Sequence, residues 1–169
     1  MKTKKLLFIT YVAIIAAIYV VLTFITQYFG LASGTIQVRL SELLVILPFF
    51  TPAAIPGLWL GCLLANFLTG CILYDVIFGS LATLLGAIGT YLLRKHKYLC
   101  TLPPVIANMV IVPLVLRYAY GFIFEYAGKD FSIPFYMLTV GIGEIICCCV
   151  LGSILLKFLS PYRNIIFKT

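Results

Sequence analysis

Long runs without charged residues alternate with short basic segments along this chain. Five runs carry no Asp, Glu, Lys or Arg, apart from Glu144 in the last one, and they cover residues 6–38, 43–74, 76–93, 98–116 and 131–156. A helix needs about 20 apolar residues to cross a bilayer. The pattern therefore predicts an all-α membrane protein that crosses the bilayer several times.

The runs predict six transmembrane helices, of which the second is short. They cover about residues 7–29, 40–50, 52–69, 75–93, 102–118 and 134–159. The run 43–74 is ambiguous, because as one helix it would extend about 48 Å, whereas the bilayer core is about 30 Å thick. Pro48, Pro52 and Pro56 fall in its first half. Since proline breaks or kinks a helix, we place a turn at Thr51 and Pro52.

The distribution of basic residues favours six crossings with both termini in the cytoplasm. With that topology nine basic residues lie inside, and three lie outside, namely Arg39, Arg117 and Lys129. If the second and third helices formed one crossing, the split would become five to seven, against the positive-inside rule. The sequence therefore predicts a multi-pass protein of the cell membrane with a single transmembrane domain over residues 1–169.

Composition supports this class and argues against others. The chain is 63% hydrophobic and 10% charged, whereas soluble domains carry about 25% charged residues. The net charge of +7 lies in short patches, as in membrane proteins, and does not indicate nucleic-acid binding. No catalytic triad, H-E-x-x-H or P-loop pattern occurs, so we expect no enzyme. The consecutive Cys147, Cys148 and Cys149 point about 100° apart on a helix, so we expect no metal ion and no cofactor.

Small residues spaced by four predict where helices pack closely. Three such rows fall on the third and fourth predicted helices: Gly57, Gly61, Ala65 and Thr69; Gly79, Thr83 and Ala87; Ala82, Gly86 and Thr90. We expect these rows to pack inside the bundle. The first predicted helix carries Ala13, Ala16 and Ala17 among bulky residues, a face that suits either internal packing or the docking of a separate membrane protein.

Six polar residues within or beside the apolar runs are candidates for a binding site. Glu144 is the clearest, because ionisable groups at membrane depth are costly and usually mark a site. The others are Arg39, Glu42, Asn66, Asp75 and Asn108. Structural roles stay open for all of them: an Arg39–Glu42 pair, a basic partner for Glu144 in Arg117 or Arg39, an N-terminal acid for the fourth helix, and hydrogen bonds between helices.

The six-crossing topology places Arg39, Glu42, Asp75 and Glu144 in the outer half of the protein. Three acids against one base suit a ligand that is cationic or rich in hydrogen-bond donors. A carboxylate accepts two parallel N–H bonds, so a guanine-like edge, with a ring N–H beside an exocyclic amine, is a specific hypothesis for the ligand.

Several short segments between residues 36 and 83 carry a resemblance to a known family. They are Ile36-Gln37-Val38-Arg39-Leu40-Ser41-Glu42, Leu47-Pro48, Pro52-Ala53-Ala54-Ile55-Pro56-Gly57, Gly61-Cys62, Ala65-Asn66 and Asp75-Val76-Ile77-Phe78-Gly79-Ser80-Leu81-Ala82-Thr83. The chain resembles the QueT family of S components of energy-coupling factor (ECF) transporters. The resemblance implies a six-helix bundle that binds a solute near the outer face, and the expected solute is a queuosine precursor, a deazaguanine that can carry an aminomethyl cation.

The same resemblance implies partner proteins. S components dock onto a transmembrane T component, which carries two cytoplasmic ATPase subunits, through an alanine face that Ala13 and Ala17 would form here. Two alternatives remain open. The chain would otherwise be an S component for another vitamin-like solute, or a stand-alone proton-coupled secondary transporter with Glu144 as the proton carrier. Inverted repeats would favour the secondary transporter, and none is evident in the sequence.

Overall fold

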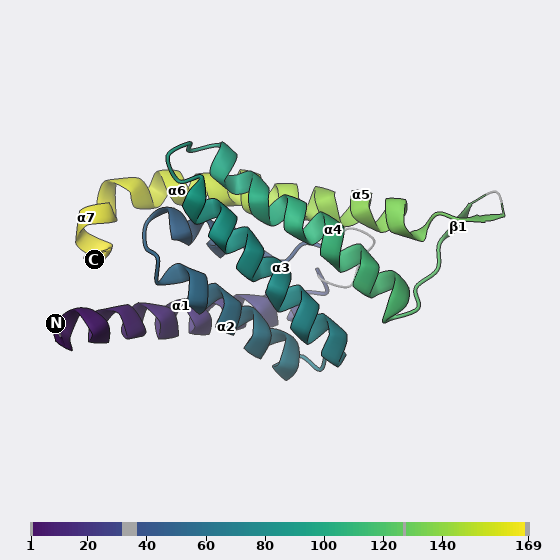
Figure 1. The fold of residues 1–169 in the computed structure, drawn as a ribbon, viewed down its shortest axis with the longest axis horizontal. Helices are drawn as coiled ribbons and strands as arrows, with labels where there is room; N and C mark the ends of the chain where they lie inside the picture. The colour runs from purple at the N-terminus through teal and green to yellow at the C-terminus, as the bar shows by residue number, and fades with distance from the viewer. Residues whose placement is uncertain (1, 32–36, 127, 168–169) are drawn as a thin grey trace.

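The computed structural model describes residues 2–31, 37–126 and 128–167, which form a bundle of apolar helices (Figure 1). The longer helices are α1 (Lys2–Tyr28), η1 (Leu40–Phe49), α2 (Ala54–Leu68), α3 (Leu73–Leu92), α4 (Leu102–Tyr118), α5 (Ser132–Glu144), η3 (Ile145–Leu151) and α6 (Gly152–Leu159). Short helices and strands complete the fold: η2 (Leu99–Thr101), β1 (Glu125–Tyr126), β2 (Lys129–Asp130), η4 (Ser160–Tyr162) and α7 (Arg163–Ile166). The fold is that of an all-α polytopic membrane protein, as predicted.

The predicted helices match the observed ones closely, with differences in helix type. The predicted helix 102–118 coincides with α4. The short second helix lies where it was predicted, but η1 is a 3₁₀-helix rather than an α-helix. The last predicted helix, 134–159, is a continuous succession of α5, a π-helical η3 and α6. The antiparallel hairpin of β1 and β2 was not predicted, because two-residue strands leave no periodic signal.

Four helical segments are long and apolar enough to cross a membrane: Thr3–Tyr28, Leu73–Leu92, Leu99–Tyr118 and Ser132–Ile166. The other two apolar helices are shorter, with 10 residues in η1 and 15 in α2. Fifteen residues of α-helix extend only about 22 Å. The ends of the chain lie at the same end of the bundle in Figure 1, and the Tyr11 hydroxyl donates a hydrogen bond of 2.5 Å to the carbonyl of Ile166. Six crossings remain a prediction, and this shared end agrees with an even number.

The rows of small residues pack inside the bundle as predicted. A Cβ atom added at Gly61 of α2 would lie 2.7 Å from the Cβ of Tyr19 on α1. On α3, a Cβ at Gly86 would lie 2.7 Å from the Cα of Pro104, at the start of α4. These contacts are too short for any larger residue, so both helix pairs depend on glycine for their close approach.

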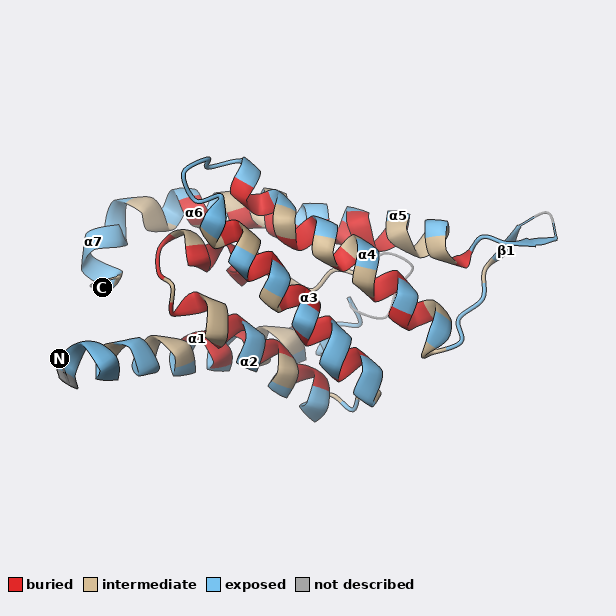
Figure 2. Ribbon diagram, in the orientation of Figure 1, coloured by how far each residue is buried: buried red, intermediate tan, exposed pale blue. Residues whose placement is uncertain are grey.

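The 3₁₀-helix η1 is the hub of the core. It contacts α1, α2, α3, α6, η2 and η3, and apart from Ser41 and Glu42 its side chains are apolar, as expected for a buried helix. Figure 2 shows buried residues concentrated where the helices face one another. Because η1 follows Arg39 and contains Glu42, the packing of this hub fixes the position of both residues.

The face of α1 turned away from the bundle is exposed. Ala13 and Ala17 both lie on it, whereas Ala16 is buried against α2. The two alanines therefore have the accessibility that a docking face requires.

Candidate functional site

A polar cavity of about 330 Å³ lies between the end of α1, the segment before η1, the junction of α2 and α3, and the end of α4. Three of the predicted site residues line it, namely Arg39, Asn66 and Asp75. Other polar and aromatic side chains in its wall include Gln27, Gln37, Tyr120 and Phe122. Its volume is at the small end of the range for small-molecule pockets, about 300–1,000 Å³.

Asp75 is held in the cavity wall at the first turn of α3. One carboxylate oxygen, Oδ2, accepts a hydrogen bond of 3.2 Å from the hydroxyl of Tyr120. The Asn66 amide donates a bond of 3.4 Å to the backbone carbonyl of Asp75, so Asn66 links α2 to α3 and also lines the cavity. A Cβ atom at Gly79 would lie 3.3 Å from Oδ1 of Asp75, which leaves that oxygen tightly packed on one side.

Arg39 is half-buried at the entrance to η1. Its guanidinium interacts electrostatically with the Asp75 and Glu42 carboxylates. No ion pair shorter than 4.0 Å joins Arg39 to Glu42 among the described residues, so the local pair considered from the sequence is not formed. Arg117 is not the partner of Glu144 either, because it pairs with Asp130 at 2.7 Å.

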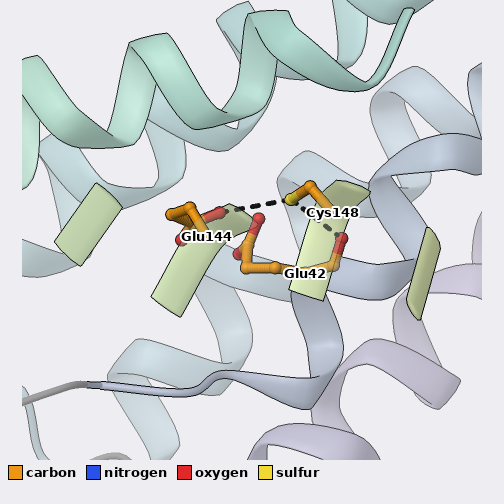
Figure 3. A group of neighbouring side chains, drawn as sticks. All are labelled: Glu42, Glu144 and Cys148. Atoms are coloured by element: carbon orange, nitrogen blue, oxygen red, sulfur yellow. Dashed lines mark hydrogen bonds between the residues drawn. The ribbon is translucent and has the colours of Figure 1, made fainter. Parts of the chain in front are cut away.

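Next to the cavity lies a second group of side chains, which we call the buried acid cluster. It consists of two carboxylates and a thiol, which Figure 3 shows pointing toward one another: Glu42, Glu144 and Cys148. All three are buried, and one donor atom from each lies within 4.8 Å of the others. The Cys148 thiol donates to Oε2 of Glu144 at 3.2 Å and to the Glu42 carbonyl at 3.5 Å. Two carboxylates and a thiol are groups that can bind a divalent metal ion.

Glu42 is only 2% exposed, and one of its carboxylate oxygens lacks a hydrogen bond. The hydroxyl of Tyr19 donates to Oε1, whereas Oε2 has no partner in the described part of the chain. Asn108 is near both carboxylates, but its Nδ2 also makes no hydrogen bond there. Buried polar atoms without partners are costly, so this buried acid cluster is prepared to receive a donor or a cation.

A close backbone contact brings the cavity and the buried acid cluster together. A Cβ atom at Gly143 of α5 would lie 2.0 Å from the carbonyl oxygen of Gln37. Glycine therefore allows the segment that carries Arg39 to lie directly against the turn before Glu144. The π-helical η3 begins after Glu144, and such segments are frequent at functional sites.

The six predicted site residues thus divide into two neighbouring groups. Arg39, Asn66 and Asp75 line the cavity, whereas Glu42, Asn108 and Glu144 belong to the buried acid cluster and do not line it. Sequence reasoning missed the roles of Tyr19, Tyr120 and Cys148. Tyr19 stands in an apolar helix and Cys148 in a run of cysteines, so neither carries a distinguishing signal. Tyr120 lies two residues after the end of α4. Its position near the predicted outer surface of the membrane was the one signal that could have indicated a role in the site.

Outside the membrane-spanning segments, Asp130 ties the hairpin to the bundle. The Ser132 hydroxyl and backbone N–H both donate to it, the latter at 2.9 Å, and Arg117 donates at 2.8 Å. These hydrogen bonds, first that from the Ser132 hydroxyl, lower the pKa of Asp130 to about 2. The connection between α4 and α5, which includes Tyr120, is therefore anchored at both ends.

Comparison with known proteins identifies the family. The family model described as "QueT transporter" matches residues 9–161. A relative from Lactococcus lactis subsp. cremoris (strain MG1363), the "Queuosine precursor transporter QueT", is 38% identical over 98 residues. That match covers 57% of this chain and 57% of the relative, so just over half of the relative's length is spanned.

No solved structure matches the chain significantly. Both descriptions are of transporters, which agrees with the expectation that the chain is not an enzyme. The chain belongs to the QueT transporter family.

Proposed function

We propose that this chain is the substrate-binding S component of an ECF transporter that imports a queuosine precursor. The observation that carries the proposal is the polar cavity, because it combines a carboxylate, a guanidinium, amides and aromatic rings within about 330 Å³. The name of the relative from Lactococcus lactis, a queuosine precursor transporter, supports the same substrate class.

The cavity offers complementary groups for a deazaguanine. The carboxylate of Asp75 would accept hydrogen bonds from the ring N–H and the exocyclic amine, and Arg39 would donate to the ring carbonyl. Asn66 supplies a further amide at the junction of α2 and α3. The rings of Tyr120 and Phe122 stack on each other with their centroids 5.5 Å apart, and they offer a flat surface beside Asp75.

The buried acid cluster would receive the cationic arm of an aminomethyl-bearing precursor. Glu42 and Glu144 carry two carboxylates, and Arg39 interacts electrostatically with both. An ammonium group provides both the missing positive charge and donors for the unpartnered Oε2 of Glu42. Asn108 stands beside the same carboxylates and completes the proposed site.

The proposed topology places six crossings in the cell membrane, with both termini in the cytoplasm. The shared end of the N- and C-termini in Figure 1 supports an even number of passages. A T component would dock on the exposed Ala13 and Ala17 of α1, and two ATPase subunits bound to it would hydrolyse ATP.

Titration of the purified chain with deazaguanine bases tests substrate recognition. Asp75→Asn removes a charged acceptor, so we expect affinity to fall by about 10- to 100-fold, since such hydrogen bonds contribute about 1.5–3 kcal/mol. Glu125→Gln, which changes an exposed acid outside the cavity, should bind as the wild type does. Equal affinities for all three proteins would contradict the proposed cavity.

Uptake of a labelled deazaguanine separates the ECF mechanism from a secondary transporter. We expect uptake only when the chain is expressed with a T component and its ATPases. Uptake by the chain alone, abolished by a proton uncoupler and by Glu144→Gln, would instead establish a proton-coupled transporter.

A further inference from the structure

A basic groove lies where the α3–α4 connection meets α6, far from the Asp75 cavity. Its volume is about 460 Å³. Two lysines line it from segments far apart in sequence, Lys97 before η2 and Lys157 in the last turn of α6. Three hydroxyl groups and two aliphatic side chains complete the lining, namely those of Tyr98, Ser153, Ser160, Ile154 and Leu156.

The connection that carries Lys97 has a fixed backbone. The Cys100 thiol donates to the carbonyl of Lys97 at 3.0 Å, and the Thr101 hydroxyl donates to the carbonyl of Tyr98 at 2.9 Å. Thr101 also contacts the Cys149 sulfur of η3 at 3.4 Å, which holds the connection against the last helical segment. The two lysines are therefore presented from a preformed groove rather than from a free loop.

The positive charge of the groove is not neutralised by acidic side chains. The chain has five acidic residues, at positions 42, 75, 125, 130 and 144, and none of them lines the groove. The nearest along the chain is Glu144, which precedes Lys157 by 13 residues. The ion pair of the described residues is that of Arg117 with Asp130, so both lysines are available to bind an anion.

The groove lies at the surface of the bilayer. The connection joins two helical segments that are each long enough to cross a membrane, Leu73–Leu92 and Leu99–Tyr118, so its residues lie at the level of the lipid headgroups. Tyr98 and Ile154 are 81% and 61% exposed beside the lysines. Tyrosine is typical of this interface, and the apolar Ile154 offers a surface for an acyl chain.

We propose that the groove binds the phosphate of an anionic glycerophospholipid. Lys97 and Lys157 contact the phosphate oxygens as two point charges, and the hydroxyls of Tyr98 and Ser153 donate to the remaining oxygens. The hydroxyl of Ser160 already donates to the carbonyl of Leu156 at 2.6 Å, so it has no proton left to donate to the phosphate. Basic pockets between membrane helices are known to bind such headgroups. The proposal depends on the bilayer position of the groove and not on the transported solute.

Native mass spectrometry of the full chain, released from nanodiscs with equal amounts of phosphatidylglycerol and phosphatidylcholine, tests the proposal. We expect the wild type to retain phosphatidylglycerol preferentially. Lys97→Gln with Lys157→Gln should weaken this retention by roughly 30-fold, because each lysine near an anionic surface contributes a factor of about five. Lys95→Gln with Arg163→Gln removes the same charge from exposed residues outside the groove and should have a much smaller effect. Lys97→Arg with Lys157→Arg should retain the lipid.

Other outcomes would overturn the proposal. Equal losses in the groove variant and in its charge-matched control would show that only general surface charge matters. Equal retention of both lipids would exclude a site for an anionic headgroup. Displacement of the lipid by inorganic phosphate at millimolar concentration would assign the lysines to free phosphate. A groove variant that keeps its lipid but no longer binds the transporter's other subunits would assign the groove to a protein. Thermal unfolding of each variant in detergent checks that it is folded.

Discussion

The cavity around Asp75 and the buried acid cluster around Glu144 use the same functional group in two different environments. Asp75 faces a space large enough for a ligand, and its carboxylate accepts a hydrogen bond from Tyr120. Glu42 and Glu144 are buried and do not line that space, and Oε2 of Glu42 has no partner among the described residues. The first environment suits recognition of a polar edge, whereas the second requires a cation or a proton to offset the cost of burial.

The close contact at Gly143 holds the cavity and the buried acid cluster together, so substitution of Gly143 should have the largest effect on stability and binding. Gly143→Ala places a Cβ atom 2.0 Å from the carbonyl of Gln37 and forces the Arg39 segment away from α5. We expect the protein to lose about 3 kcal/mol of stability, as for a strongly overpacked core position, and to bind ligand poorly. Thermal unfolding in detergent measures the loss.

Gly152→Ala is the matched control, because its Cβ would meet no atom closer than 3.5 Å. We expect the melting temperature of that variant to remain within a few degrees of the wild type. Equal stability of the two variants would show that the close contact at Gly143 is not required.

Glu144→Gln separates the roles of the two regions. We expect affinity for an aminomethyl-bearing deazaguanine to fall by about tenfold or more, because a charged hydrogen bond is lost. Affinity for an uncharged deazaguanine should change little, since its edge would bind at Asp75. Calorimetric titration with the two ligands measures both affinities.

The comparison of ligands provides the control for Glu144, and Glu125→Gln provides the control for loss of an acidic side chain elsewhere. A uniform loss of affinity for both ligands would place Glu144 in general support of the bundle rather than at the cationic arm. Unchanged affinity for both would remove the buried acid cluster from the binding site.

Tyr120→Phe is a smaller change on the cavity side. It removes the hydrogen bond to Asp75 but keeps the ring that stacks on Phe122. A net contribution of about 1 kcal/mol predicts a roughly fivefold loss of affinity, for charged and uncharged ligands alike. A loss as large as that of Asp75→Asn would instead indicate that the hydroxyl contacts the ligand itself.

The smallest effect concerns pH and the anchor of the hairpin. Because hydrogen bonds hold the folded pKa of Asp130 at about 2, below its ordinary value of 3.8, the anchor is intact above about pH 4 and is lost as the pH falls through 2. Since Asp130 is exposed, we expect only a slight destabilisation of the hairpin. Thermal unfolding as a function of pH should show wild type and Asp130→Asn converging at acidic pH, and parallel profiles would contradict the anchor.

Sequence patterns predicted the parts of the fold that prolines and charges delimit. Pro103, Pro104 and Arg117 lie near the ends of α4, and its bounds were predicted correctly. Arg39 and Pro48 marked the short second helix, although the pattern did not distinguish a 3₁₀-helix from an α-helix. Regular apolar runs carry little information on helix type, so the π-helical η3 was also missed.

The site was harder to predict, because a helix that is apolar all round does not reveal its orientation. Glu144 was expected to contact the ligand, and that stays a prediction; the structure places it with Cys148 in the buried acid cluster rather than in the cavity wall. Tyr19 contacts Glu42 from the first helix, in which the sequence singled out only the alanines. The sequence identified which polar residues gather in one part of the bundle, and tertiary packing decided which of them line the accessible space.

A single guanidinium interacts with two groups of acidic side chains, one in the cavity wall and one in the buried acid cluster. Arg39 interacts electrostatically with Asp75 on one side and with Glu42 and Glu144 on the other. A cationic group bound beside Glu42 and Glu144 neutralises part of their charge. The interaction of Arg39 with these carboxylates then weakens, and its interaction with Asp75 strengthens. By thermodynamic linkage, binding at Asp75 changes the affinity at Glu42 and Glu144 by the same factor. We therefore expect binding at Asp75 and binding at the two buried glutamates to be coupled, with Arg39 setting the strength of that coupling.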